Sequence, residues 1–204
     1  MSETLTRGDE ARLTPDRWQL EQEVVALRRE EGTRLNAARE DPNELGRYVF
    51  RFPFGQHHVQ LVQALQTHDR LIVEAPPRSG KTATLTHWFL WLIGRDPNIR
   101  ILYVSSSDMQ ATVVSSLVKS TIEFRPEYRE LFPDVRPDSD RGWADNEWFV
   151  KRPKPFKDPT FSAFGKGGPI LTRGADVIVY ESVRPHTARV NALHERNRQT
   201  GTIR

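Results

Sequence analysis

Residues 71–82 read Leu71-Ile72-Val73-Glu74-Ala75-Pro76-Pro77-Arg78-Ser79-Gly80-Lys81-Thr82. The apolar run at the start predicts a buried strand over 70–74, and the spacing of apolar residues over 81–93 predicts a helix directly after the loop. A strand, a short loop and a helix in this order place free backbone N–H groups at a helix N-terminus, where phosphate groups bind. The segment therefore predicts a phosphate-binding loop in an α/β fold.

The residue types in this loop suit the phosphates of a nucleotide, ATP or GTP. Gly80 lets the backbone approach the phosphates, Lys81 reaches the β and γ oxygens, and the Thr82 hydroxyl is placed to bind Mg²⁺. Ala75 replaces the usual first glycine of the pattern, so the pair Pro76-Pro77 must shape the loop through its fixed φ angles. The alternative is a chance Gly-Lys-Thr in a turn, which the flanking strand and helix patterns disfavour.

Further apolar runs alternate with helical patterns along the chain. We expect helices over 56–66, 81–93 and 108–124, and strands over 100–105 and 175–181. This alternation predicts a mostly parallel sheet with helices on both faces. Residues 133–175 are rich in Pro, Asp and Gly, and predict an irregular lobe at the C-terminal edge of the sheet, with extended pieces at 148–150 and 160–163.

The two ends of the chain differ from this core. Thr14 and Pro15 predict the start of a helix that breaks at Gly32, and a second piece over 33–39 ends before Asp41-Pro42. We expect three parts, namely a charged helical extension over 1–45, an α/β core over 46–183 and a basic helical segment over 184–204.

The composition is that of an ordinary globular domain. The 204 residues include 30 Lys and Arg, 27 Asp and Glu and no Cys, which gives a formal net charge of +3 and excludes disulfides and thiolate metal sites. No apolar stretch approaches the roughly 20 residues of a membrane span, and no signal-peptide pattern is present, so we expect a soluble intracellular protein without a membrane partner. The excess of 24 Arg over 6 Lys suits phosphate contacts, but GC-rich coding explains it equally well.

A carboxylate at the end of the strand over 175–181 completes the expected site. Nucleotide hydrolysis needs one carboxylate to organise Mg²⁺ and another to orient the attacking water. Glu181 is the candidate for the second role, or else a surface carboxylate, whereas Tyr180 occupies the position where the first is expected. Asp176 lies at the other end of the strand, about 13 Å away, too far to replace it.

Three further groups are candidates with plainer alternatives. Arg78 is a candidate to contact the γ-phosphate or a neighbouring subunit's nucleotide, or else a solvated loop residue. His57 and His58 are candidates to close over a base, although histidines that open an amphipathic helix are more often surface and cap residues. Residues 151–157, Lys-Arg-Pro-Lys-Pro-Phe-Lys, are candidates for a DNA-backbone contact, with a solvated loop as the favoured interpretation.

Several motifs together carry a resemblance to a known family. They are Phe54-Gly55-Gln56-His57-His58, Pro76-Pro77-Arg78-Ser79-Gly80-Lys81-Thr82, Tyr103-Val104-Ser105-Ser106-Ser107, the segment 126–135, and Gly167-Gly168 with Thr172-Arg173-Gly174-Ala175-Asp176 before the Glu181 strand. Over about residues 48–183 the chain resembles the ATPase domain of the large terminase subunit of tailed bacteriophages, the motor that packages viral DNA.

The resemblance implies a P-loop NTPase fold of the additional-strand catalytic-glutamate type, with ATP hydrolysis driving double-stranded DNA into the prohead. It implies a cofactor site of Pro77, Arg78, Ser79, Gly80, Lys81, Thr82 and His58 for ATP, Thr82 and Glu181 for Mg²⁺ through water, and Glu181 and Arg78 as catalytic residues, the latter as an arginine finger. The implied partners in the host cytoplasm are DNA, the portal, the small terminase subunit, and further copies of the chain or a complementing downstream polypeptide.

The chain departs from the family at Ala75, at Tyr180 and in ending at Arg204. Family members continue into a further strand, which inserts between the Glu181 strand and the phosphate-loop strand, and into a nuclease domain. We therefore expect an incomplete sheet. A split or decayed terminase fragment that binds nucleotide or partners without turnover stays open as an alternative, and a helicase-like or defence ATPase is a weaker one.

Overall fold

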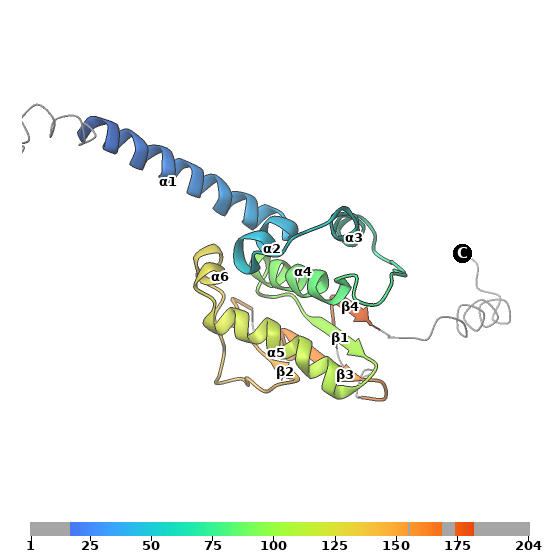
Figure 1. The fold of residues 1–204 in the computed structure, drawn as a ribbon. Helices are drawn as coiled ribbons and strands as arrows, with labels where there is room; N and C mark the ends of the chain where they lie inside the picture. Colours follow the sequence, from blue (N-terminus) through green and yellow to red (C-terminus); the bar gives the residue numbers. More distant parts are fainter. Residues whose placement is uncertain (1–16, 155, 169–173, 182–204) are drawn as a thin grey trace, which may run out of the picture.

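The computed structural model of the protein describes residues 17–154, 156–168 and 174–181. In chain order its elements are α1 (Arg17–Glu40), α2 (Pro42–Phe50), α3 (Gln56–Thr67), α4 (Lys81–Arg95), β1 (Ile101–Ser105), α5 (Asp108–Phe124), α6 (Pro126–Leu131), β2 (Glu147–Trp148), β3 (Phe161–Gly165) and β4 (Val177–Tyr180). Figure 1 shows α1 projecting from a body in which α4 and α5 lie in front of the sheet.

The described strands form one sheet in the order β2-β3-β1-β4. β1 pairs in parallel with β3 and with β4, while β2 is antiparallel to β3. All five residues of β1 and of β3 are buried, as expected for the centre of a parallel sheet. The predictions of an α/β fold, a mostly parallel sheet and strands over 100–105 and 175–181 are thus confirmed.

The helices lie on one face of the sheet within the described residues. The main hydrophobic core joins β1 and β3 to α4 and α5, with Tyr103 and Phe161 against Phe89 and Val118. Because strand residues alternate between faces, Leu102, Val104 and Phe164 lie on the opposite face, where they form a smaller cluster that includes no described helical residue. The expectation of helices on both faces is not met in the described part of the chain.

The predicted strand over 70–74 is wrong. Residues 71–76 pair with no strand, and the side chains of Leu71, Ile72 and Val73 are 38%, 87% and 43% exposed. An apolar run favours burial, but a strand forms only where a neighbour supplies hydrogen bonds, and none of the described strands pairs with this segment. β4 is partly exposed although its apolar run favours burial, since Ile178 and Tyr180 are 65% and 53% exposed at the edge of the described sheet.

The N-terminal helix is continuous through Gly32, which corrects the predicted break. A glycine inside a helix costs only about 1 kcal/mol relative to alanine, and Gly32 has no contact that would force a bend. The helix ends at Glu40 as predicted, and the Asp41 side chain caps α2 by accepting from the Asn43 N–H at 2.7 Å. The predicted cap at Thr14 lies outside the described residues. None of the described helices is long and apolar enough to span a membrane.

The proposed boundary at residue 45 falls inside α2. Ala38 and Leu45 are fully buried and belong to the main core. Arg39 donates to the Leu131 carbonyl at 3.0 Å, and Trp91 donates to the Arg39 carbonyl at 2.9 Å, so the end of α1 is tied to α4 and α6. The three-part division of the chain stays a prediction, and the expected helical segment over 184–204 lies outside the described residues.

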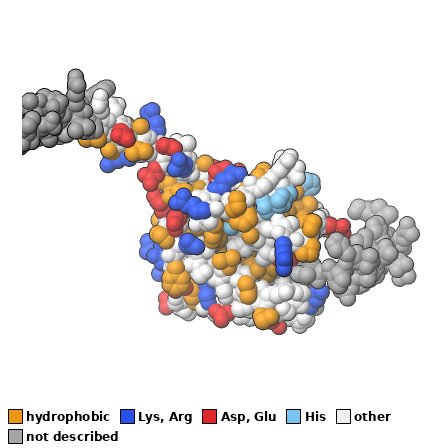
Figure 2. Space-filling view, in the orientation of Figure 1, with side chains coloured by type: hydrophobic (Ala, Val, Ile, Leu, Met, Phe, Trp, Pro, Cys, Tyr) orange, Lys and Arg blue, Asp and Glu red, His pale blue; other side chains and the backbone are white. Residues whose placement is uncertain are grey.

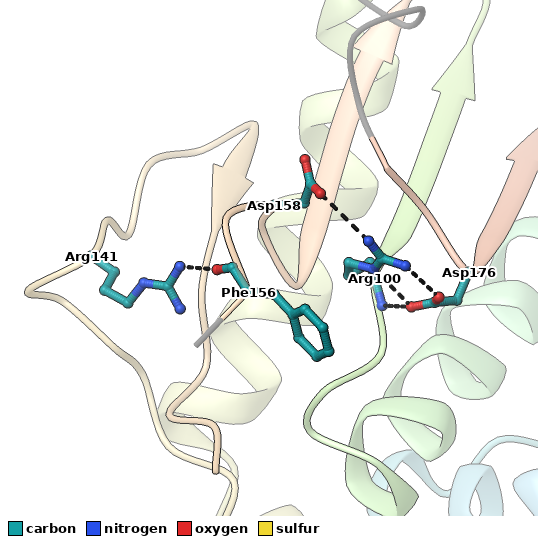
Figure 3. A network of polar contacts seen from close by, with 5 residues as sticks. All are labelled: Arg100, Arg141, Phe156, Asp158 and Asp176. Atoms are coloured by element: carbon teal, nitrogen blue, oxygen red, sulfur yellow. Dashed lines mark hydrogen bonds and ion pairs between the residues drawn. The ribbon is translucent and has the colours of Figure 1, made fainter. Parts of the chain in front are cut away.

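The predicted irregular lobe contains a central strand and lies elsewhere than expected. β3 occupies 161–165 between β1 and β2, so a brief apolar run here has neighbours on both sides. Arg100, directly before β1, binds Asp158 before β3 and Asp176 before β4 (Figure 3). The loop that precedes β3 therefore lies at the N-terminal ends of the parallel strands, not at their C-terminal edge.

Candidate nucleotide-binding site

The loop before α4 has two residues with left-handed backbone. Arg78 and Gly80 have φ angles of +61° and +78°, and Gly80 is the N-cap of α4. A Cβ at Gly80 would lie 2.4 Å from Nε2 of His58. Glycine is therefore required at this position both for the backbone conformation and for the close approach of His58.

His58 supports the loop from α3. The Gly55 N–H donates to Nδ1 of His58 at 2.9 Å, so Nε2 carries the proton and donates to the Ser79 carbonyl at 2.9 Å. Burial, and the neighbouring His57, lower the pKa of His58 and favour its neutral form. His58 thus caps α3 and also contacts the loop before α4. Figure 2 shows histidine side chains at the surface.

Lys81 folds back into the loop that precedes it. Its Nζ donates to the carbonyl oxygens of Ala75 and Pro76, both at 2.8 Å, and lies 3.4 Å from the Ser79 hydroxyl. The ammonium group is therefore held at the centre of the turn by neutral acceptors. None of these contacts of Lys81 is a carboxylate, so the positive charge of the ammonium group is available to an anion that binds at this point.

Thr82 and Glu181 meet although 99 positions separate them in the sequence. The Thr82 hydroxyl donates to Oε1 of Glu181 at 2.6 Å, and the Tyr103 hydroxyl donates to Oε2 at 2.6 Å. The Glu181 N–H donates to the Val104 carbonyl at 2.7 Å, which extends the pairing of β4 with β1. Three elements, α4, β1 and β4, thus fix one carboxylate beside the loop that precedes α4.

Tyr103 is the residue of this site that sequence reasoning missed. It is 1% exposed, and burial followed by the Glu181 carboxylate raises the pKa of its hydroxyl. Tyr103 lies on the core face of β1, where it pairs in register with Val179, two residues before Glu181 in the sequence. The available signal is a tyrosine in an otherwise aliphatic buried strand, because a buried hydroxyl needs a hydrogen-bond partner.

Tyr180 does not join this cluster. It pairs with Val104 in register, so it lies on the opposite face of the sheet from Tyr103, with the Lys166 ammonium 5.8 Å from its ring centre. Asp176 is bound to Arg100 at the other end of β4. Within the described residues no group of three or more His, Cys, Asp or Glu side chains is arranged to hold a metal ion.

A pocket of about 340 Å³ lies between α3 and the loop. It is lined by His57, His58, Gln60, Leu61, Ala64, Ile72, Val73, Glu74, Ala75, Ser79 and Lys81. This volume is in the range of small-molecule sites. Arg78 is exposed and forms no hydrogen bond or ion pair with any other described residue, so its guanidinium is available to a group outside the described structure.

The chain matches no protein-family model. It is 28% identical over 116 residues to the terminase large subunit of Enterobacteria phage T3, an alignment that spans 56% of this chain and 19% of that protein. The chain thus spans about a fifth of the length of this relative. The match supports a distant, terminase-like relationship.

Proposed function

We propose that this chain is the ATP-binding part of a phage DNA-packaging motor. The observation that carries the proposal is the hydrogen bond from Thr82 to Glu181, which brings the end of the phosphate loop and a strand-end carboxylate into one site. These are two of the groups that ATP hydrolysis uses, a hydroxyl for the metal and a carboxylate for the attacking water. The distant terminase large subunit supplies the link to DNA packaging.

In this proposal the phosphates bind at the N-terminus of α4. Pro77, Arg78, Ser79 and Gly80 form the turn, and Lys81 moves from the loop carbonyls to the phosphate oxygens. Mg²⁺, when bound, would neutralise phosphate charge, and its preference for oxygen ligands suits the Thr82 hydroxyl and, through water, the Glu181 carboxylate.

Glu181 orients the attacking water and accepts its proton. The Tyr103 hydroxyl holds the carboxylate in place through Oε2, which leaves Oε1 for the water once Thr82 has released it. Arg78 reaches the nucleotide of a neighbouring copy as an arginine finger. The adenine base occupies the pocket beside His58.

The partners proposed for the motor are double-stranded DNA, the portal, the small terminase subunit, and further copies of the chain or a complementing polypeptide. They rest on the relationship to the terminase large subunit. They are proposals for this chain because the alignment covers only 19% of the relative.

One observation favours a second reading, in which the chain binds nucleotide without turnover. Tyr180 stands where a Mg²⁺-organising carboxylate is expected, and its ring lies on the other face of the sheet from Glu181. A single carboxylate at the site organises the metal and its water less well than two. Slow or absent hydrolysis by the chain alone follows from this arrangement.

A titration with a fluorescent ATP analogue, together with a phosphate-release assay, tests the proposal. We expect Lys81→Ala to weaken binding at least tenfold, because it removes the charge that faces the phosphates. Glu181→Gln keeps one oxygen that accepts from a hydroxyl, and its amide group can donate to the other hydroxyl, so the variant should bind ATP but hydrolyse none. Glu30→Gln on α1 is the matched control, since its ion pair with Arg34 is exposed.

The outcomes separate the two readings. Magnesium-dependent release of phosphate that Glu181→Gln abolishes supports the ATPase. Binding that Lys81→Ala weakens, without phosphate release in the wild type, supports the non-hydrolysing form. Equal affinity of wild type and Lys81→Ala would overturn both.

A further inference from the structure

Residues 151–154 and 156–157 form a basic surface at the N-terminal ends of β1, β3 and β4, the opposite end of the strands from Glu181. Figure 3 shows the neighbourhood, with Arg141 reaching the Phe156 carbonyl and Arg100 lying between Asp158 and Asp176. The side chains of Lys151, Lys154 and Lys157 are exposed along the loop. None of these groups takes part in the candidate nucleotide site.

Arg100 binds the two carboxylates that precede β3 and β4. Arg100 contacts Asp176 at 2.7 Å and Asp158 at 3.5 Å. Five more cations, Arg141, Lys151, Arg152, Lys154 and Lys157, form no ion pair with a carboxylate in the described parts of the chain. The surface therefore carries an excess of positive charge that the described structure does not neutralise.

Arg152 lies beneath this surface and adds to the uncompensated charge. Two of its nitrogens donate to the Thr160 hydroxyl, at 2.7 and 3.1 Å, and its buried Nη1 has no partner. Burial, and the positive charges of Arg141 and Arg100, lower the pKa of Arg152 to about 10. A bound anion would relieve this repulsion, because each negative charge offsets the interaction of the cations with one another.

Two aromatic rings hold the cations in place. The guanidinium carbons of Arg141 and Arg152 lie 4.3 and 5.5 Å from the centre of the Phe149 ring. Phe156 is 36% exposed and lies beside Arg100 at 5.4 Å. The guanidinium groups are thus ordered by stacking, whereas the lysines stay free to contact an extended, multiply charged ligand.

We propose that Arg141, Lys151, Lys154 and Lys157 form a binding surface for the phosphate backbone of double-stranded DNA. Several separate cations spread over one loop fit a chain of phosphates better than a single small anion. The choice of DNA rests on the proposed packaging function, but the surface lies apart from the nucleotide site. DNA should therefore bind without ATP.

Fluorescence anisotropy of the full chain with a labelled 30-base-pair duplex, titrated at several salt concentrations, tests the proposal. The variant is Lys151→Ala/Lys154→Ala/Lys157→Ala. The matched control is Arg28→Ala/Arg29→Ala/Arg34→Ala, which removes the same charge from exposed positions on α1. Circular dichroism and the ATP-analogue titration report whether each variant keeps its fold and its nucleotide site.

We expect the lysine variant to lose at least tenfold in DNA affinity. The slope of log K against log salt should fall in magnitude by about 2 to 3, because each lost phosphate contact removes about 0.9. The control should keep most of the slope. The proposal is overturned by an unchanged slope in the lysine variant, by an equal loss in the control, or by equal competition from inorganic phosphate or polyglutamate at matched ionic strength. If the lysine variant loses DNA binding but still binds the ATP analogue, the DNA surface is separate from the proposed nucleotide site.

Discussion

Acidification should destabilise the protein through His87, a buried residue of α4. Its side chain is 4% exposed, its ring stacks on Phe50 with centres 4.6 Å apart, and its Nδ1 has no hydrogen-bond partner. Phe52 and Phe54 lie 5.0 and 5.4 Å away and lead directly into the cap of α3. Burial, and then the charge that His58 carries when it is protonated, lower the pKa of His87 from 6.5 to about 4.

The size and sign of the effect follow from this shift. Between pH 6.5 and about 4 the unfolded chain is protonated at this position and the folded chain is not, so the free energy of unfolding falls as the pH falls through this window. At about 1.4 kcal/mol for each pH unit, the full shift corresponds to about 3 kcal/mol, lost by pH 4. Above pH 6.5 the residue makes no contribution of this kind.

Urea unfolding followed by tryptophan fluorescence at pH 4.5, 5.5 and 7 measures the effect. His87→Phe keeps a ring of suitable size and cannot titrate, and His87→Leu serves if phenylalanine does not fit. We expect the wild type to lose about 2 kcal/mol more than the variant between pH 7 and pH 4.5. His68→Gln, at an exposed position, should behave as the wild type. Parallel pH curves for wild type and His87→Phe would refute the reasoning.

Three further changes have expected results. Gly80→Ala should destabilise by about 1 to 3 kcal/mol and weaken ATP-analogue binding, through its positive φ and the contact with His58; equal thermal midpoints would contradict this. Tyr103→Phe removes the hydrogen bond to Glu181, so any phosphate release should slow while nucleotide affinity is retained; loss of affinity alone would count against it. β4 is the outer strand of the described sheet, so we expect the chain to self-associate through it and Ile178→Lys to reduce light scattering by placing a charge there; unchanged scattering would argue against edge pairing.

Local signals predicted most of the helices and two of the strands. The helix over 108–124 is found with its predicted ends because Ser107 caps it and one apolar face, with Val114, Val118 and Ile122, packs in the core. The prediction of a strand over 70–74 is wrong for a non-local reason. A strand forms only where a partner strand lies beside it, and the apolar run itself does not indicate whether one does. The predicted helix break at Gly32 is wrong because a single glycine destabilises a long helix only weakly.

The sequence predicts most residues of the candidate site, but neither Tyr103 nor the contacts between the residues. The phosphate loop and Glu181 are visible in the sequence as a motif and a strand end, and the structure places them together. The role of Tyr103 depends on the register of β1 against β4, and the support from His58 depends on where α3 packs. Both are tertiary relationships that no local pattern contains.

The contacts of Glu181 suggest how the site changes when a nucleotide binds. Thr82 holds Oε1 and Tyr103 holds Oε2, so in this state both carboxylate oxygens are already hydrogen-bonded. Thr82 lies beside Lys81 at the start of α4 and is exposed, whereas Tyr103 is buried in β1, so only the first bond is free to open without disturbing the core. Nucleotide binding at the loop should therefore release Oε1 while Tyr103 keeps the carboxylate in position. Thr82→Val, which mimics this release without ligand, should leave the fold intact and remove the link between the loop and β4, and hydrogen exchange of the loop amides would report it as faster opening.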